Sequence, residues 1–117
     1  MKNFQCLLSL WLILTGLIGI NSAFGQSQAA VWYFGNKAGL RFDGDKPPIQ
    51  LNDAVMNTRE GCATICDPNG ELLFYTNGEK VWNRNHAVMG WGKGLHGHES
   101  TTQSSIIVPR PLSADEY

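Results

Sequence analysis

Three short runs suited to strands, separated by turn sequences, occupy the middle of the chain. Asp-Pro-Asn-Gly at residues 67–70 divides residues 62–66 from residues 71–76, and Asn-Gly at residues 77–78 divides the second run from residues 79–83. Asn-Gly supplies the two residues with positive φ in a type I′ turn, which suits paired strands. Asp-Pro-Asn-Gly suits a type I turn followed by a left-handed glycine. The pattern predicts an antiparallel three-stranded meander.

Further strands are predicted on both sides of this meander. Residues 30–34 are aromatic and β-branched, residues 39–42 alternate between apolar and polar positions, and residues 49–51 predict a brief strand. Residues 104–109 (Ser-Ser-Ile-Ile-Val-Pro) predict the last strand. Residues 90–97 contain four glycines and predict a long loop. No helix is expected after residue 25, so the pattern indicates an all-β protein.

A four-stranded repeat is the architecture that this pattern favours. Leu-Leu-Phe-Tyr at residues 72–75 is continuously apolar, which predicts a strand covered on both faces. Ile107 and Tyr117 follow Ile65 and Tyr75 at a spacing of about 42 residues, within the period of propeller blades. We therefore expect antiparallel meanders of a β-propeller-like domain, a fragment of roughly two blades. A small β-sandwich is the alternative.

The first 25 residues have the pattern of a secretory signal peptide. Lys2 precedes an apolar run over residues 7–20, and the small residues Ala23 and Gly25 stand before Gln26. We expect cleavage after Gly25 by export machinery, with a retained membrane anchor as the alternative. After processing we expect no membrane span.

The end of the chain leaves residues 104–109 without a hairpin partner, since the sequence stops at Tyr117. An unpaired apolar edge strand promotes self-association. We therefore expect residues 26–117 to be the N-terminal part of a propeller-like domain that is truncated at its C-terminal end.

The charge of the chain argues against a nucleic-acid partner, and the spacing of its cysteines argues against a disulfide. The chain has 9 Lys and Arg against 10 Asp and Glu, a formal net charge of −1, with no basic cluster for nucleic acid. Cys62 and Cys66 would lie roughly 13 Å apart on one strand. A disulfide requires Cα atoms within roughly 7 Å. We expect two unpaired cysteines buried on a strand.

Candidate metal ligands lie in the loop that follows the meander. His96, His98 and Glu99 offer imidazole and carboxylate groups of the kind that zinc takes, with His86 nearby, but their spacing matches no established zinc signature. Residues 43–45 with Asp53, or residues 67–71, offer oxygen ligands for calcium without the spacing of an EF-hand loop. We therefore interpret these segments as a solvated loop and as turns, and expect no cofactor.

Catalytic and stacking residues are the remaining candidates. The hydroxyls at residues 100–105 lack a Gly-x-Ser-x-Gly elbow and a defined base, so strand edges and turns explain them better. Trp91, with Trp82, Tyr75 and His86, offers a surface on which a sugar could stack, and Trp91 is the candidate ligand-binding residue. Trp82 and Trp32 lie within predicted strands and are expected in the core.

Five segments together resemble a known group of proteins: residues 32–36 (Trp-Tyr-Phe-Gly-Asn), 60–65, 73–78, 81–86 and 103–109. They resemble the N-terminal region of large exported Bacteroidetes proteins that carry gliding-motility-associated or type IX secretion sorting domains at their C-termini. The resemblance implies a propeller-like domain delivered to the cell surface or the medium. It supplies no catalytic residues, and this chain shows no sorting domain.

The sequence therefore predicts an exported, cell-surface or secreted module with a binding or structural role. Its expected partners are the export machinery, through the signal peptide, and a surface glycan or protein; no reaction can be assigned. The alternative is part of a carbohydrate-active propeller hydrolase, which requires paired carboxylates facing a pocket.

Overall fold

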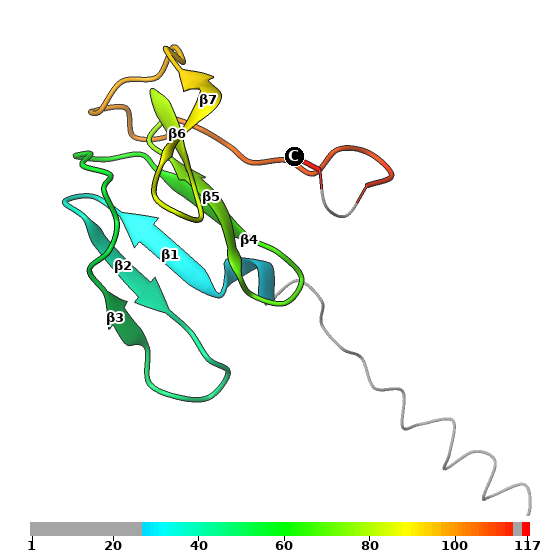
Figure 1. Ribbon diagram of the computed structural model, residues 1–117. Helices are drawn as coiled ribbons and strands as arrows, with labels where there is room; N and C mark the ends of the chain where they lie inside the picture. The colour runs from blue at the N-terminus through cyan, green and yellow to red at the C-terminus, as the bar shows by residue number, and fades with distance from the viewer. Residues whose placement is uncertain (1–26, 114–115) are drawn as a thin grey trace, which may run out of the picture.

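Two antiparallel sheets make up the fold in the computed structural model, which describes residues 27–113 and 116–117 (Figure 1). The first sheet, in chain order, comprises β1 (Val31–Phe34), β2 (Ala38–Arg41) and β3 (Ile49–Leu51). The second comprises β4 (Ala63–Cys66), β5 (Leu72–Thr76), β6 (Lys80–Asn83) and β7 (Val88–Lys93). A single 3-10 turn, η1 (Ser27–Ala29), precedes β1. The prediction of an all-β protein built from antiparallel meanders is confirmed.

The turn between β4 and β5 forms as its sequence predicts. Asp67 Oδ1 accepts hydrogen bonds from the backbone N–H groups of Asn69 at 2.8 Å and Glu71 at 3.0 Å. Gly70 has a φ of 84° and donates its N–H to Asp67 O at 2.9 Å. The aspartate side chain thus satisfies the backbone of the turn, and the glycine adopts the left-handed conformation that other residues avoid.

The turn between β5 and β6 differs from the type I′ prediction. Only Gly78 of the Asn-Gly pair has a positive φ, 83°. Asn77 is buried, and its Oδ1 accepts hydrogen bonds from the N–H groups of Glu79 and Lys80 at 3.1 Å and 3.0 Å. Thr76 Oγ1 accepts from Gly78 N–H and donates to the Lys80 carbonyl. Side-chain hydrogen bonds, which the dipeptide alone does not reveal, determine this turn.

The fourth strand of the second sheet is β7, so the prediction of a loop over residues 90–97 is wrong for its first half. Lys93 pairs with Lys80, and Val88 pairs with Trp82. Gly92 is required at its position, because a Cβ there would lie 2.7 Å from Val81 Cβ. The glycines therefore allow close approach to β6 instead of breaking the strand.

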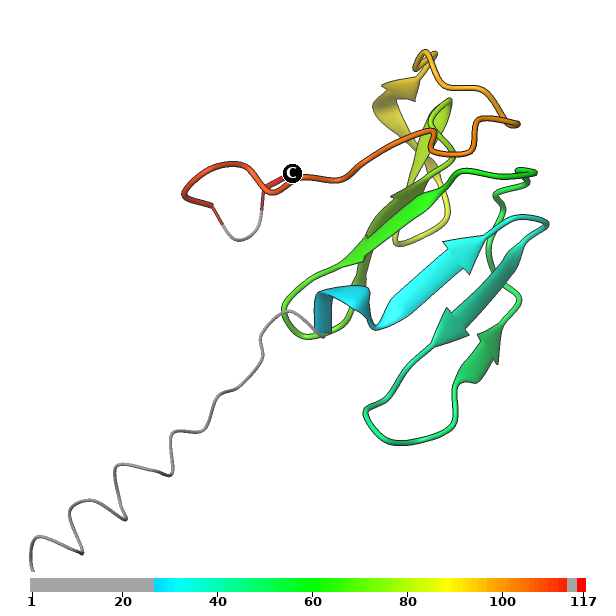
Figure 2. The same ribbon diagram turned by 180° about the vertical axis from the view of Figure 1, so that it is seen from behind.

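The predicted strand at residues 104–109 does not form. This segment is irregular. Ser104 contacts Gly61, and beyond it the segment runs away from both sheets (Figures 1 and 2), with Ile106 and Val108 exposed. β7 already occupies the position beside β6. Pro109 and Pro111 also lack the N–H donors that strand pairing uses.

The core lies where the inner faces of the two sheets meet, and β1 lies beside β4. Its buried apolar residues are Val31, Tyr33, Ala54, Met56, Cys66, Tyr75 and Trp82. Trp82 is in the core as predicted, but the same prediction for Trp32 is wrong. β1 alternates, so Val31 and Tyr33 point inward while Trp32 points outward and is 52% exposed. Trp32 packs against Phe42 instead, at a centroid distance of 5.0 Å.

The two cysteines and the apolar run on β5 are only partly as expected. Both thiols are free; Cys66 is fully buried, whereas Cys62 is half-buried and contacts the Tyr33 carbonyl at 3.4 Å. Burial raises the pKa of both thiols.

On β5, Tyr75 is fully buried, but Leu72, Leu73 and Phe74 are half-buried. The outer face of the second sheet is therefore open in part.

The segment after β7 is held against the rest of the fold by close backbone contacts. Gly61 N–H donates to the Thr101 carbonyl at 2.9 Å, and Ser104 Oγ donates to the Gly61 carbonyl at 2.7 Å. Gly97 N–H donates to the Gly78 carbonyl at 2.9 Å. A Cβ on Gly61 would lie 2.5 Å from both Ser104 N and Thr101 O. Glycine is therefore needed where the segment crosses this site.

We predict that Gly61→Ala lowers the free energy of unfolding by about 1–3 kcal/mol, the usual cost of inserting a methyl group into a packed site. Gly90→Ala is the matched control, because a Cβ at Gly90 meets no atom within 4 Å. Urea unfolding followed by tryptophan fluorescence measures both. Equal stability of the two variants would contradict the packing described.

Candidate functional site

Four side chains from distant parts of the chain meet between the two sheets. Tyr33 comes from β1, Asp53 from the segment after β3, Tyr75 from β5 and His86 from the turn after β6. Tyr33 Oη donates to Asp53 Oδ1 at 2.8 Å. His86 Nε2 lies 3.3 Å from Asp53 Oδ2, and Tyr75 Oη lies 3.1 Å from His86 Nδ1. We call these four residues the Tyr–His–Asp cluster.

The hydrogen bonds around the cluster indicate how its protons are arranged. Val55 N–H donates to Tyr75 Oη at 3.3 Å. The hydroxyl can then donate its own proton to His86 Nδ1, which leaves Nε2–H to face Asp53. In this tautomer, His86 lies between a donor at Nδ1 and an acceptor at Nε2.

The local backbone places His86 at the cluster. His86 has a φ of 59°, and its N–H donates to the Asn83 carbonyl at 2.9 Å. Asn83 Oδ1 accepts hydrogen bonds from the N–H groups of Asn85 and Ala87 at 2.9 Å and 3.1 Å. These hydrogen bonds fix the turn so that the His86 ring points back toward Tyr33. The two rings lie edge-on, with their centroids 5.7 Å apart.

Burial controls the ionisation of both tyrosines. Burial raises the pKa of the Tyr33 phenol above its ordinary value, and the hydrogen bond to Asp53 and the charge of its carboxylate raise that pKa further. Burial also raises the pKa of Tyr75, although the Val55 N–H opposes the shift. Both phenols are therefore held in the neutral, proton-donating form.

The order Asp53–His86–Tyr75 resembles an orienting acid, a base and a nucleophile. Tyr75 is fully buried, however, and Tyr33 is 4% exposed. A nucleophile must reach its substrate, so this geometry connects the sheets and does not form an open catalytic site. Sequence reasoning missed the cluster because its members share no motif and come from four separate segments.

An open apolar groove lies on the outer face of the second sheet. It has a volume of about 360 Å³ and is lined by Phe74, Val81, Met89, Gly90, Trp91, Gly92 and Tyr117. Trp91 is 100% exposed and Met89 is 43% exposed. We call this feature the Trp91 groove.

Glycines and the C-terminal tyrosine give the Trp91 groove its form. Gly90 and Gly92 flank the indole and carry no side chains, so both sides of Trp91 remain open. Tyr117 packs edge-on against Phe74 at a centroid distance of 6.1 Å. Gln28 Nε2 donates to Tyr117 Oη at 2.9 Å. The groove is thus an aromatic surface with a phenol at its margin.

Of the four residues considered for a stacking surface, only Trp91 is exposed. Tyr75 and Trp82 are buried and stack on each other, with ring centroids 5.4 Å apart and an interplanar angle of 14°. His86 belongs to the Tyr–His–Asp cluster. The prediction that these three residues join Trp91 at one surface is therefore wrong. Successive residues of a strand face opposite sides of the sheet, so Tyr75 and Trp82 face the core while their neighbours Phe74 and Val81 line the groove.

The proposed metal ligands do not converge. His98 Nδ1 accepts the Ser100 N–H at 3.2 Å and lies 2.8 Å from Ser100 Oγ. The Glu99 carbonyl accepts the N–H of Arg59, and its carboxylate pairs with the same arginine at 3.6 Å. His96 is exposed. Over the described residues, no group of three or more His, Cys, Asp and Glu side chains could hold a metal ion.

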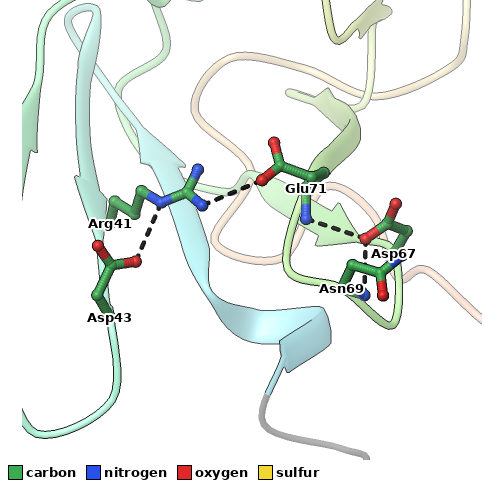
Figure 3. Close-up of polar contacts among 5 residues, drawn as sticks. All are labelled: Arg41, Asp43, Asp67, Asn69 and Glu71. Carbon is green, nitrogen blue, oxygen red and sulfur yellow. Dashed lines mark hydrogen bonds and ion pairs between the residues drawn. The ribbon is translucent and has the colours of Figure 1, made fainter.

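Turn chemistry and ion pairing account for the residues considered for calcium (Figure 3). Arg41 Nε lies 3.1 Å from Asp43 Oδ1, and Arg41 Nη2 lies 3.2 Å from Glu71 Oε1. Asp67 caps its own turn, as described above. Arg41 therefore joins β2 of the first sheet to the start of β5, because it pairs with the carboxylates of both Asp43 and Glu71.

Three of the hydroxyl candidates, Ser100, Thr102 and Ser104, have structural partners. Ser104 Oγ donates to the Gly61 carbonyl, and Thr102 Oγ1 donates to Glu60 Oε2 at 3.3 Å. Ser100 contacts His98, but within the described part of the chain no carboxylate pairs with that ring. The third group that a catalytic triad requires is therefore not provided there.

Comparison with known proteins assigns no family. No protein-family model matches the chain, and it has no significant match among the curated proteins or the solved structures.

We predict that Tyr33→Phe flattens the loss of stability at alkaline pH. Folding raises the pKa of the Tyr33 phenol above 10.0, its value in the unfolded chain. The phenol therefore adds its full contribution to the free energy of unfolding below pH 10.0, and this contribution is lost as the pH rises toward the folded pKa. Each such tyrosine contributes a slope of about 1.4 kcal/mol per pH unit in that range. Urea unfolding from pH 8 to 11 measures the slope.

Trp32→Phe is the control for this experiment, because Trp32 lies outside the Tyr–His–Asp cluster and carries no group that titrates in this pH range. Its slope should equal that of the wild type. Identical slopes for Tyr33→Phe and Trp32→Phe would contradict the coupling of Tyr33 ionisation to folding.

Proposed function

We propose that this chain is an exported, cell-surface or secreted module that binds a partner through the Trp91 groove. The observation that carries the proposal is the complete exposure of Trp91 beside an apolar groove of about 360 Å³. Exposed aromatic residues at a concave apolar surface are typical of binding sites. A glycan with a flat sugar face, or an apolar protein surface, fits an indole flanked by glycines.

The architecture that we propose is propeller-like. The second sheet has four antiparallel strands in chain order, which is the arrangement of a propeller blade. The resemblance to exported Bacteroidetes proteins with gliding-motility-associated or type IX secretion sorting domains belongs to the same proposal, as does delivery to the cell surface or medium.

The export proposal rests on the sequence pattern of residues 1–25, which lie outside the described residues. Among the residues that the structure describes, no helix has the length and apolar character needed to cross a membrane. The alternative role as part of a carbohydrate-active hydrolase would need two carboxylates roughly 5–9.5 Å apart. The Tyr–His–Asp cluster contributes only Asp53, so we prefer the binding role.

We predict that the exported protein begins at Gln26. Intact-mass measurement and N-terminal sequencing of protein recovered outside the cytoplasm should show loss of residues 1–25. Ala23→Lys, which places a charged long side chain where the cleavage site needs a small one, should block processing. A chain that keeps Met1 in the recovered protein would contradict the export proposal.

We predict that Trp91→Ala reduces binding to the partner surface by about 30-fold, as expected for loss of a central aromatic contact worth about 2 kcal/mol. The probes are insoluble cellulose, chitin and intact cells of the producing organism, with depletion of purified protein from solution as the readout. Trp32→Ala is the control, since it removes a partly exposed tryptophan from the other sheet.

Wild-type protein that is depleted by none of these probes would contradict the binding role. Equal depletion of wild type and Trp91→Ala would show that binding does not use the Trp91 groove. A circular dichroism spectrum for each variant verifies that the fold is retained.

A further inference from the structure

The meander contains two Asn-Gly pairs whose side chains have opposite environments. Asn77 is 5% exposed, and its Oδ1 accepts two backbone hydrogen bonds, from Glu79 and Lys80. Asn69 is exposed at the tip of the β4–β5 turn. Only its backbone N–H is bonded, to Asp67 Oδ1, and its side-chain amide makes no hydrogen bond within the described residues.

An asparagine followed by glycine can react with its own backbone. The Gly nitrogen attacks the Asn Cγ, so a Cγ–N bond forms, the Cγ–Nδ2 bond breaks, and ammonia leaves with the proton from the glycine N–H. Water then opens the five-membered imide at either carbonyl to give aspartate or isoaspartate. Water is the only co-reactant, and no electrons are transferred. Glycine favours the reaction because it has no side chain to hinder the approach.

We propose that Asn69 is a site of spontaneous deamidation and that the fold protects Asn77. At Asn77 the two hydrogen bonds to Oδ1 and the surrounding core must be lost before Cγ can be attacked. At Asn69 the side chain is free to turn toward the nitrogen of Gly70. There the hydrogen bond from Gly70 N–H to the Asp67 carbonyl must open; Gly70 itself is buried, but the Asn69 side chain that must turn is exposed.

Water has direct access to Asn69. A polar surface pocket of about 230 Å³ is bordered by Asn69 and Gly70, and also by Arg41 and Asp43. In Figure 3, Asn69 and Asp67 lie together in the turn, and Glu71 lies between them and the Arg41 side chain. Solvent can therefore reach the imide as it forms.

Deamidation would change the charge and the backbone of this turn. A new carboxylate at residue 69 would lie beside Asp67 and Glu71, and the net charge would fall by one. Isoaspartate would also add one carbon to the backbone between the two N–H groups that Asp67 Oδ1 binds. Both changes act next to the Arg41–Glu71 ion pair that joins the two sheets. The reaction thus alters the inter-sheet surface with time after synthesis.

One tryptic peptide tests the proposal, because residues 60–80 contain both Asn-Gly pairs between Arg59 and Lys80. Purified protein is incubated at pH 7.4 and 37 °C in H₂¹⁸O, exchanged into ordinary water, digested briefly with trypsin at mildly acidic pH, and sequenced by tandem mass spectrometry. Asn69 should convert at least about tenfold faster than Asn77, as expected when hydrogen bonds must first break at the second site. Isoaspartyl methyltransferase labelling should locate isoaspartate at residue 69.

The unfolded protein is the internal control. In 8 M urea the protection of Asn77 is lost, so the two rates should converge. Equal native rates, faster conversion of Asn77, or a rate difference that persists in urea would overturn the proposal. Asn69→Gln should abolish the charge heterogeneity on ion exchange, because the longer side chain closes its ring far more slowly; heterogeneity that persists unchanged in this variant would also overturn it.

Discussion

The structure depends on the contact that Tyr33 makes across the two sheets. Its backbone N–H and carbonyl both bond the Thr64 hydroxyl on β4, its ring packs on Tyr75 with centroids 4.8 Å apart, and its hydroxyl donates to Asp53. The backbone, ring and hydroxyl of Tyr33 thus all have partners within one interface. His86 adds a further contact there, to the Asp53 carboxylate. Because an isolated small sheet is marginally stable in water, this contact lets each sheet support the other.

The same arrangement separates the inner and outer faces of the second sheet. Tyr75 and Trp82 point inward and are buried in the core, so they are not available to contact a partner. Phe74 and Val81 point outward, and with Trp91 they form the groove that we assign to binding. Alternation along the strands therefore gives the sheet a stabilising face and a face available to a partner. The buried phenols hold the two layers together and leave the outer face open.

Local sequence signals predicted the strands well where the turn chemistry was self-contained. The strand at residues 49–51 and the Asp67 turn formed as expected. The segments at 90–97 and 104–109 did not, because glycine in β7 served close packing on Val81 and the sheet edge was already occupied. Trp91 was singled out because an exposed aromatic residue in a glycine-rich segment is unusual; it is exposed, and its role in binding stays a prediction. The Tyr–His–Asp cluster was beyond local reasoning, since it depends on how four separate segments pack.

Native-state hydrogen exchange would test most directly whether the Tyr33 contact makes one cooperative unit of the two sheets. The account predicts that the slowest amides of β1–β2 and of β5–β6 exchange with the same free energy of opening and the same denaturant dependence. That common value should equal the free energy of global unfolding. Exchange of β1 and β2 through a smaller opening that leaves β5 and β6 protected would contradict it.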